Sequence, residues 1–276
     1  MARTTRAPVN PKRKSRAASA DRHELYEQAV QDPPSEVEFV SKTFRKLRGR
    51  KPLRIREDFC GTAAFSQQWV RSGKQHEAWG IDLDEETLRW TREKRVCNLS
   101  AHQRDRLHLR KADVLNHCAP PVEVAVAFNF SYWTFKTRAE LLKYFRHCYK
   151  RLAEDGIFFL DVLGGLEIAQ ADETVTRLKG FTYVWEHASF NPITHDFLCH
   201  IHFKFSDGST ISPAFTYDWR LWSLPELREL LKEAGFSKTR VYWEDEDEDG
   251  EETGQFSEVA SVENQATWWA YLVAQK

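Results

Sequence analysis

Apolar residues recur at two spacings along this chain, and each spacing predicts a different kind of element. Between residues 53 and 162, short apolar runs alternate with segments whose apolar positions recur every three or four residues. The runs predict strands at residues 53–56, 77–82, 107–112, 122–128 and 156–162. The other segments predict helices at residues 64–72, 85–98 and 138–153, and two earlier helices at 22–29 and 35–47. Such alternation is typical of a mainly parallel sheet that helices cover on both faces.

After Gly165 the helical segments give way to alternating patterns. Three strands are predicted at residues 181–190, 197–205 and 210–221, and Asp207-Gly208 between the last two is a strong hairpin signal. We therefore expect residues 166–222 to form a small antiparallel β insert or lid.

The C-terminal part returns to the earlier pattern. Ser223 and Gly235 bracket a predicted helix at residues 224–234, and strands follow at 239–243 and 267–274. Only a polar loop separates these strands, and a parallel connection needs a crossover helix, so the last strand is predicted to run antiparallel. The sequence thus predicts seven strands in the main sheet, with the last one reversed.

Charge is uneven along the chain although its sum is small. The 276 residues carry a formal net charge of −1, which argues against global attraction to nucleic acid or to a membrane surface. Residues 1–20 are basic, without apolar periodicity, and are predicted to be a disordered tail before a single domain at 21–276. Residues 244–252 are acidic except for Gly250.

Targeting signals and cysteine spacing bound the setting. No apolar run approaches the roughly 20 residues that span a bilayer, and the basic N-terminus lacks the apolar core of a secretory signal. Five scattered cysteines without a C-x-x-C pair indicate reduced thiols and no structural zinc site. We expect a cytoplasmic protein with no membrane partner and no bound metal.

The most informative motif follows the first predicted strand of the sheet. Glu57-Asp58-Phe59-Cys60-Gly61-Thr62-Ala63 is a small-residue turn that leads into a helix, and Asp82 ends the second strand about twenty residues later. An acid at this separation from a glycine turn holds a ribose in βαβ proteins, while backbone N–H groups hold the rest of the ligand. The turn cannot supply G-x-G-x-x-G, so a dinucleotide dehydrogenase is disfavoured.

These residues resemble the class I S-adenosylmethionine-dependent methyltransferases, which have a Rossmann-like fold. Their first motif, D-x-G-C-G-T-G in many members, is matched by Glu57 and by Cys60, Gly61 and Thr62, whereas Phe59 and Ala63 replace two glycines. Asp82, Asp113 and Asn129 match positions after the second, third and fourth strands. The likeness spans about residues 35–276 and, with the insert, points to the small-molecule members of that superfamily.

The resemblance implies S-adenosyl-L-methionine as the cofactor and assigns roles to individual residues. Gly61 would let the backbone close on the cofactor, Glu57 would orient the turn and reach the methionine ammonium, and Asp82 would bind the ribose hydroxyls. Asp113 would accept from the adenine amino group. The remaining cofactor-binding residues would be Cys60, Thr62, Leu83, Val114, whose N–H faces the adenine ring, and Asn129 near the sulfur. Two structural alternatives stay open, a helix cap for Asp82 and an ordinary loop acid for Asp113.

The acceptor side is less well defined by the sequence. Tyr132 and Trp133 would line a substrate pocket or pack beneath the insert, and Arg220 would pair a substrate carboxylate. Asn129-Phe130-Ser131-Tyr132 lacks both prolines of the N-P-P-Y motif of amino-group methyltransferases and does not predict nitrogen methylation. The insert aromatics form either a cage for a cationic or aromatic substrate or, as we favour, a packed core; they are Phe181, Tyr183, Trp185, Phe190, Phe215, Tyr217, Trp219 and Trp222.

No catalytic residue is assigned, because methyl transfer from a sulfonium needs a base only when the nucleophile arrives protonated. Asp161 and His187 are the candidates for such a base, and His200 with His202 lacks a third metal ligand. We predict methyl transfer to a small-molecule acceptor. The alternatives are an RNA or protein methyltransferase steered by the basic tail, and a non-catalytic cofactor-binding scaffold. A nucleic-acid partner is not expected, and the oligomeric state is open.

Overall fold

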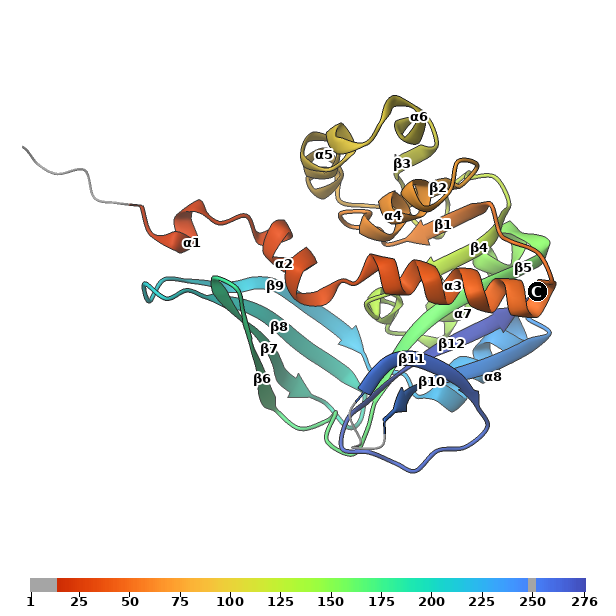
Figure 1. The fold of residues 1–276 in the computed structure, drawn as a ribbon. Coiled ribbons are helices and arrows are strands. Elements are labelled where there is room, and N and C mark those ends of the chain that lie inside the picture. The colour runs from red at the N-terminus through yellow and green to blue at the C-terminus, as the bar shows by residue number, and fades with distance from the viewer. Residues whose placement is uncertain (1–13, 248–251) are drawn as a thin grey trace, which may run out of the picture.

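The computed structural model of the chain describes residues 14–247 and 252–276, and its main feature is an eight-stranded sheet (Figure 1). The strand order is β11-β10-β12-β5-β4-β1-β2-β3, and the pairs among β1 to β5 are parallel. The bounds are β1 (Arg54–Asp58), β2 (Glu77–Asp82), β3 (Leu107–Lys111), β4 (Val122–Ala127), β5 (Leu152–Gly164), β10 (Lys238–Glu246), β11 (Glu252–Val259) and β12 (Trp268–Gln275). As predicted, the last strand is reversed: β12 pairs antiparallel with β5.

The sheet has one strand more than the seven predicted. β11 pairs antiparallel with β10 at the edge, within the segment expected to be a polar loop. Most of its residues are exposed, so it carries no apolar alternation. Phe256 and Val259 are half-buried, and Phe256 packs against Trp269 and Tyr271. An edge strand of this kind leaves little hydrophobic signal in a sequence. Part of the acidic stretch, residues 248–251, lies outside the described residues.

Helices cover both faces of the sheet, as the sequence predicts. α3 and α4 pack on one face, through residues such as Phe44 and Trp69, and α7 and α8 pack on the other, through Phe145 and Leu231. The helix bounds are α1 (Arg16–Ser19), α2 (Arg22–Val30), α3 (Pro33–Arg48), α4 (Ala64–Ser72), α5 (Glu85–Lys94), α6 (Ala101–Arg104), α7 (Arg138–Arg151) and α8 (Leu224–Ala234), with short 3₁₀ turns η1 (Val96–Asn98) and η2 (Ser131–Thr134). Within the described residues, no helix combines the length and the apolar character needed to cross a membrane.

The insert is a separate antiparallel sheet of order β6-β7-β8-β9 (Figure 1). It comprises β6 (Asp172–Leu178), β7 (Phe181–Phe190), β8 (Asp196–Lys204) and β9 (Thr210–Arg220). The three predicted strands are present, and β6 is an additional one whose residues are nearly all exposed. One face of this sheet packs under α2, where Leu25 contacts a cluster that includes Phe181 and Phe203.

The N-terminal segment joins the insert to the main domain. The predicted disorder over residues 1–20 differs from the structure at its end, because α1 is a helical turn whose Arg16 N–H donates to Asp207 at 2.8 Å. Residues 1–13 lie outside the described residues. On the other side, the Trp90 indole N–H donates to Asp21 at 2.6 Å, just before α2. These contacts hold α2 across the carboxyl ends of β1, β2 and β4.

Candidate active site

A cavity of about 410 Å³ lies at the carboxyl ends of β1, β2 and β4, where parallel sheets usually bind ligands. We call it the β1–β2 cavity. Seven of the predicted cofactor residues line it: Glu57, Cys60, Gly61, Thr62, Asp82, Leu83 and Asn129. The structure therefore brings together most of the residues that the motifs predict to bind the cofactor.

Gly61 and Asp82 are in direct contact in the wall of this cavity. The Gly61 N–H donates to Oδ2 of Asp82 at 2.7 Å, and the Asp84 N–H donates to Oδ1 at 2.8 Å. The turn is held closer still by the Cys60 N–H, which donates to the Ile81 carbonyl at 3.0 Å. A carboxylate accepts about four hydrogen bonds, so Asp82 keeps lone pairs for ligand hydroxyls.

The turn after β1 needs an unusual backbone. Gly61 has φ +49°, and a Cβ built on it would meet nothing within 4 Å, so its backbone faces open space. Phe59 has φ +57° and occupies the position of a glycine in the related motif. Its ring packs against Phe135 and Tyr144, with centroids 5.9 and 5.6 Å away. Phe59 therefore does not separate Gly61 from Asp82, and the turn closes without the missing glycine.

The side chain of Cys60 points away from the cavity. It is 2% exposed and packs with Ala63 and Leu88, and its sulfur lies close to Gly80 of β2. Burial raises the pKa of the thiol well above its ordinary range. Cys60 thus contributes backbone to the cavity and a reduced, unreactive side chain to the core.

Glu57 lies below the turn as a buried carboxylate. It accepts a hydrogen bond from the Ser66 N–H, in the first turn of α4, at 2.8 Å. Burial raises its pKa to about 7, and the nearby charges of Asp82 and Asp58 act in the same direction. A positively charged ligand group beside Glu57 would favour its ionised form.

Asp58 belongs to a different network under the same turn. Its carboxylate pairs with the buried Arg56 guanidinium at 2.7 Å, and the Tyr144 hydroxyl donates to it at 2.9 Å. Asp58 is thereby neutralised by a structural partner. The remaining acids of the cavity, Glu57, Asp82 and Asp84, face one arginine, Arg22 of α2.

This balance favours a ligand with net positive charge. His23, which also lines the cavity, does not add to the positive side, because burial lowers its pKa below the ordinary value. A pyrophosphate would meet three carboxylates here, whereas a sulfonium or ammonium group would be stabilised by them.

The turn after β4 is organised by Asp161 of β5. Asn129 and Phe130 both have positive φ, +56° and +54°, and both N–H groups donate to the Asp161 carboxylate. Burial raises the pKa of Asp161 to about 7. Because both of its oxygens are engaged by this turn, Asp161, one of the two candidate bases, positions Asn129 at the cavity wall.

Two predicted adenine contacts do not reach the cavity. The Asp113 carboxylate accepts from the Leu115 N–H at 2.8 Å, and Val114 is 4% exposed within the core. Neither residue lines the β1–β2 cavity. In this structure the Asp113 carboxylate bonds within the loop after β3, as a loop acid does, and its predicted contact with adenine stays a prediction.

The predicted substrate residues are also elsewhere. Tyr132 and Trp133 are fully buried and so have no surface for a substrate; the Tyr132 hydroxyl donates to the Asp161 carbonyl at 2.8 Å. Arg220 donates to Glu226 at 3.1 Å and to the Lys136 carbonyl at 3.2 Å, and it stacks over Trp222. Trp133 and Arg220 join the insert to the main domain, and none of the three residues lines either cavity described here. Their predicted contact with a substrate stays a prediction.

A second cavity of about 260 Å³ adjoins the first, and we call it the aromatic cavity. Tyr26, Asn129, Tyr217 and Trp219 line both cavities. The wall is completed by Val30, Phe130, Leu163, Thr174, Tyr183, Trp185 and Ile201. Several insert aromatics that we expected to be a packed core thus face a hollow. His187, the other candidate base, does not line it, because its ring packs against Phe197 with centroids 5.0 Å apart.

The contribution of α2 to the site has no counterpart in the sequence motifs. Arg22, His23, Tyr26 and Gln31 line the β1–β2 cavity, yet the sequence shows only a short helix there. Their place depends on how α2 docks between the insert and α5, which local patterns do not report. The alternate spacing of Tyr217 and Trp219 was the one signal available for the wall formed by β9.

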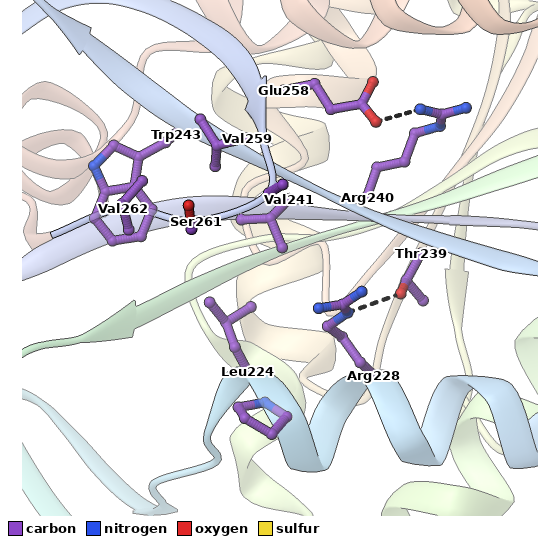
Figure 2. Close-up of a pocket in the computed structure, with 12 residues that line it drawn as sticks. Leu224, Arg228, Thr239, Arg240, Val241, Trp243, Glu258, Val259, Ser261 and Val262 are labelled. Atoms are coloured by element: carbon purple, nitrogen blue, oxygen red, sulfur yellow. Dashed lines mark hydrogen bonds and ion pairs between the residues drawn. The ribbon is translucent and has the colours of Figure 1, made fainter. Parts of the chain in front are cut away.

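A groove of about 340 Å³ lies between α8 and the β10–β11 hairpin (Figure 2). Its arginines are engaged, Arg228 with the Thr239 hydroxyl at 3.1 Å and Arg240 with Glu258 (Figure 2). It shares no residue with the β1–β2 cavity and lies at the opposite edge of the sheet from β2. We therefore place the functional site at the two joined cavities.

The fold is that of the S-adenosylmethionine-dependent methyltransferases. One similar structure is such an enzyme from Clostridium acetobutylicum, with 15% identity, a TM-score of 0.67, and coverage of 92% of this chain and 96% of that one. Another is an amino pentose methyltransferase from Micromonospora echinaspora, with 15% identity, a TM-score of 0.64 and coverage of 92% and 95%. A sugar N-methyltransferase from Streptoalloteichus aligns at 16% identity and a TM-score of 0.60, over 100% of this chain and 99% of that one. No protein-family model and no curated sequence matches the chain.

Proposed function

We propose that this protein is an S-adenosylmethionine-dependent methyltransferase that acts on a small-molecule acceptor. The observation that carries the proposal is the contact between Gly61 and Asp82 at the mouth of a cavity rich in acids. Asp82 has lone pairs for the ribose hydroxyls, the open space at Gly61 admits the ligand, and Glu57 suits a methionine ammonium.

The bound cofactor would supply a methyl group already activated on a sulfonium. The protein's own contribution is then alignment and exclusion of water, which lower the barrier without a covalent intermediate. Asn129 lies where the two cavities meet, and Asp161 fixes it there through the backbone. The aromatic cavity has the size of a small molecule, and the similar structures named above include methyltransferases of sugars.

The direct test is to incubate the protein with labelled S-adenosylmethionine and a metabolite extract and to identify the labelled product. We expect S-adenosylhomocysteine to form in proportion to the protein and a small molecule to carry the label. An Asp82→Ala variant should lose most of this turnover. Label found only in macromolecules would overturn the small-molecule assignment, and no turnover with any extract would favour a cofactor-binding scaffold.

A further inference from the structure

The aromatic cavity differs sharply in charge from its neighbour. None of the described residues that line it is Asp, Glu, Lys, Arg or His; the polar side-chain groups in its wall are tyrosine hydroxyls, indole N–H groups, Asn129 and Thr174. A phosphate or carboxylate placed there would lose its hydration without gaining a countercharge, which is costly. An anionic acceptor is therefore disfavoured at this site.

Aromatic side chains dominate the wall that belongs to the insert. Trp185 of β7 lies with its centroid 5.9 Å from Tyr217 and 6.1 Å from Trp219, both of β9. Tyr217 and Trp219 stack at 4.4 Å. A cation that lies over the face of such a ring is attracted to it, most strongly over an indole and where water is excluded.

The wall also holds no group that could act as a base at neutral pH. Burial raises the pKa of Tyr26, Tyr183 and Tyr217 well above the ordinary value, so these hydroxyls stay protonated. Asp161 is engaged with the backbone behind the wall. An alcohol or phenol would need a base to become nucleophilic, whereas a neutral amine carries its lone pair already.

We propose that the acceptor is a small amine on an apolar frame, methylated at nitrogen, with Trp185, Tyr217 and Trp219 forming a cage for its cationic head. This assignment rests on the proposed function. The neutral amine, after releasing its proton to water, attacks the methyl carbon of the sulfonium. The N–C bond forms, the C–S bond breaks, and sulfur keeps the electron pair as a thioether. The positive charge thus moves from sulfur to nitrogen, where the cage stabilises the product.

Binding of three matched probes to the protein loaded with S-adenosylhomocysteine tests the cage. The probes are choline, its neutral isostere 3,3-dimethylbutanol, which has a tert-butyl group in place of the trimethylammonium, and the carboxylate 3,3-dimethylbutanoate. We expect choline to bind about 10-fold more tightly than the neutral isostere and the carboxylate to bind more weakly than both. Trp185→Leu should abolish the preference for choline. Trp243→Leu, in the separate groove of Figure 2, is the matched control and should keep the preference.

The outcomes separate this inference from the proposed function. Equal affinity for choline and its isostere, tighter binding of the carboxylate, or no choline binding to protein that holds S-adenosylhomocysteine would each overturn the cage. A product labelled on oxygen would overturn nitrogen as the acceptor atom. Failure of the protein to bind S-adenosylhomocysteine would overturn the proposed function itself, and the cage with it.

Discussion

The backbone N–H of Gly61 donates to the carboxylate of Asp82 at 2.7 Å, although the two residues are 21 positions apart in the chain. The contact exists because β1 and β2 are adjacent parallel strands with Asp58 opposite Ile81. The glycine turn after β1 and the acid at the end of β2 therefore meet at the carboxyl ends of the two strands. The same carboxylate that fixes the turn has lone pairs left for a ribose, which couples the shape of the site to its chemistry.

Replacing Asp82 by Ala should weaken cofactor binding by about 2–3 kcal/mol, because two charge-assisted hydrogen bonds to the ribose are lost. Calorimetric titration with S-adenosylhomocysteine measures the change, which is on the order of 100-fold in Kd. Asp105→Ala, at an exposed position before β3, is the matched control and should bind as the parent does. Unchanged affinity in Asp82→Ala would place the ribose elsewhere.

Cofactor affinity should depend on pH through Glu57. Its pKa of about 7 in the free protein means that the carboxyl is largely protonated below pH 7, when it cannot pair with the methionine ammonium. Binding of S-adenosylmethionine should therefore weaken by up to about 10-fold per unit of pH below 7 and release protons. Calorimetry in buffers of different ionisation enthalpy measures that release. Glu57→Gln should bind the cofactor more weakly, with an affinity that no longer depends on pH. A parent protein whose affinity does not change with pH would contradict this role of Glu57.

Stability of the free protein should change with pH in the opposite sense. The folded pKa of Glu57, about 7, lies above the ordinary 4.5, so the folded state binds more protons between these values. The free energy of unfolding should then fall as pH rises from 4.5 to 7, by on the order of 3 kcal/mol from this group. Urea unfolding at a series of pH values measures this change. The free energy of unfolding of Glu57→Gln should fall less steeply with pH than that of the parent. An equal dependence on pH in both proteins would mean that Glu57 is ionised in the folded protein.

The buried pair beneath the turn should contribute strongly to stability. Asp58→Asn leaves the fully buried Arg56 without its countercharge, which typically costs about 3–5 kcal/mol. Asp155→Asn, which breaks an exposed pair with Arg50, should cost at most about 1 kcal/mol. Urea unfolding compares the two variants. Similar losses in both would show that the Arg56 charge is solvated in the folded protein.

Trp133 should behave as a core residue. Trp133→Ala removes a fully buried side chain that packs against Trp219 and Phe197, so we expect a loss of about 3–5 kcal/mol in unfolding free energy. Trp185→Leu, at the half-buried wall of the aromatic cavity, should affect acceptor binding more than stability. A Trp133 variant that unfolds like the parent but fails to bind acceptor would restore its predicted substrate role.

The sequence predicted the elements that pack against the core and missed those that do not. β2, β4 and β5 carry apolar runs because both of their faces are buried, and each was found within a few residues of its true bounds. β1 was found as well, although Ile55 is its one apolar residue and its other buried side chains are charged. β6 and β11 are held by hydrogen bonds to a neighbouring strand and leave most side chains in solvent. Their apolar pattern is therefore too weak to detect.

The site divides in the same way. Residues in consecutive turns after β1 and β2 could be predicted because short chain segments place them together. The motifs did not indicate that Asp113 lies outside the cavity, where the Leu115 N–H donates to its carboxylate in the loop after β3. The place of Tyr26 depends on how α2 packs between the insert and α5, which are distant from α2 in the sequence. Tyr132 and Trp133 follow a strand end like true site residues, but η2 turns both into the core.

A crystal structure of the complex with S-adenosylhomocysteine measures the central relationship directly. We predict that the ribose hydroxyls lie within hydrogen-bond distance of the Asp82 carboxylate while the Gly61 backbone borders the same ligand. A nucleoside bound outside the β1–β2 cavity, or a ribose that makes no contact with Asp82, would contradict the account.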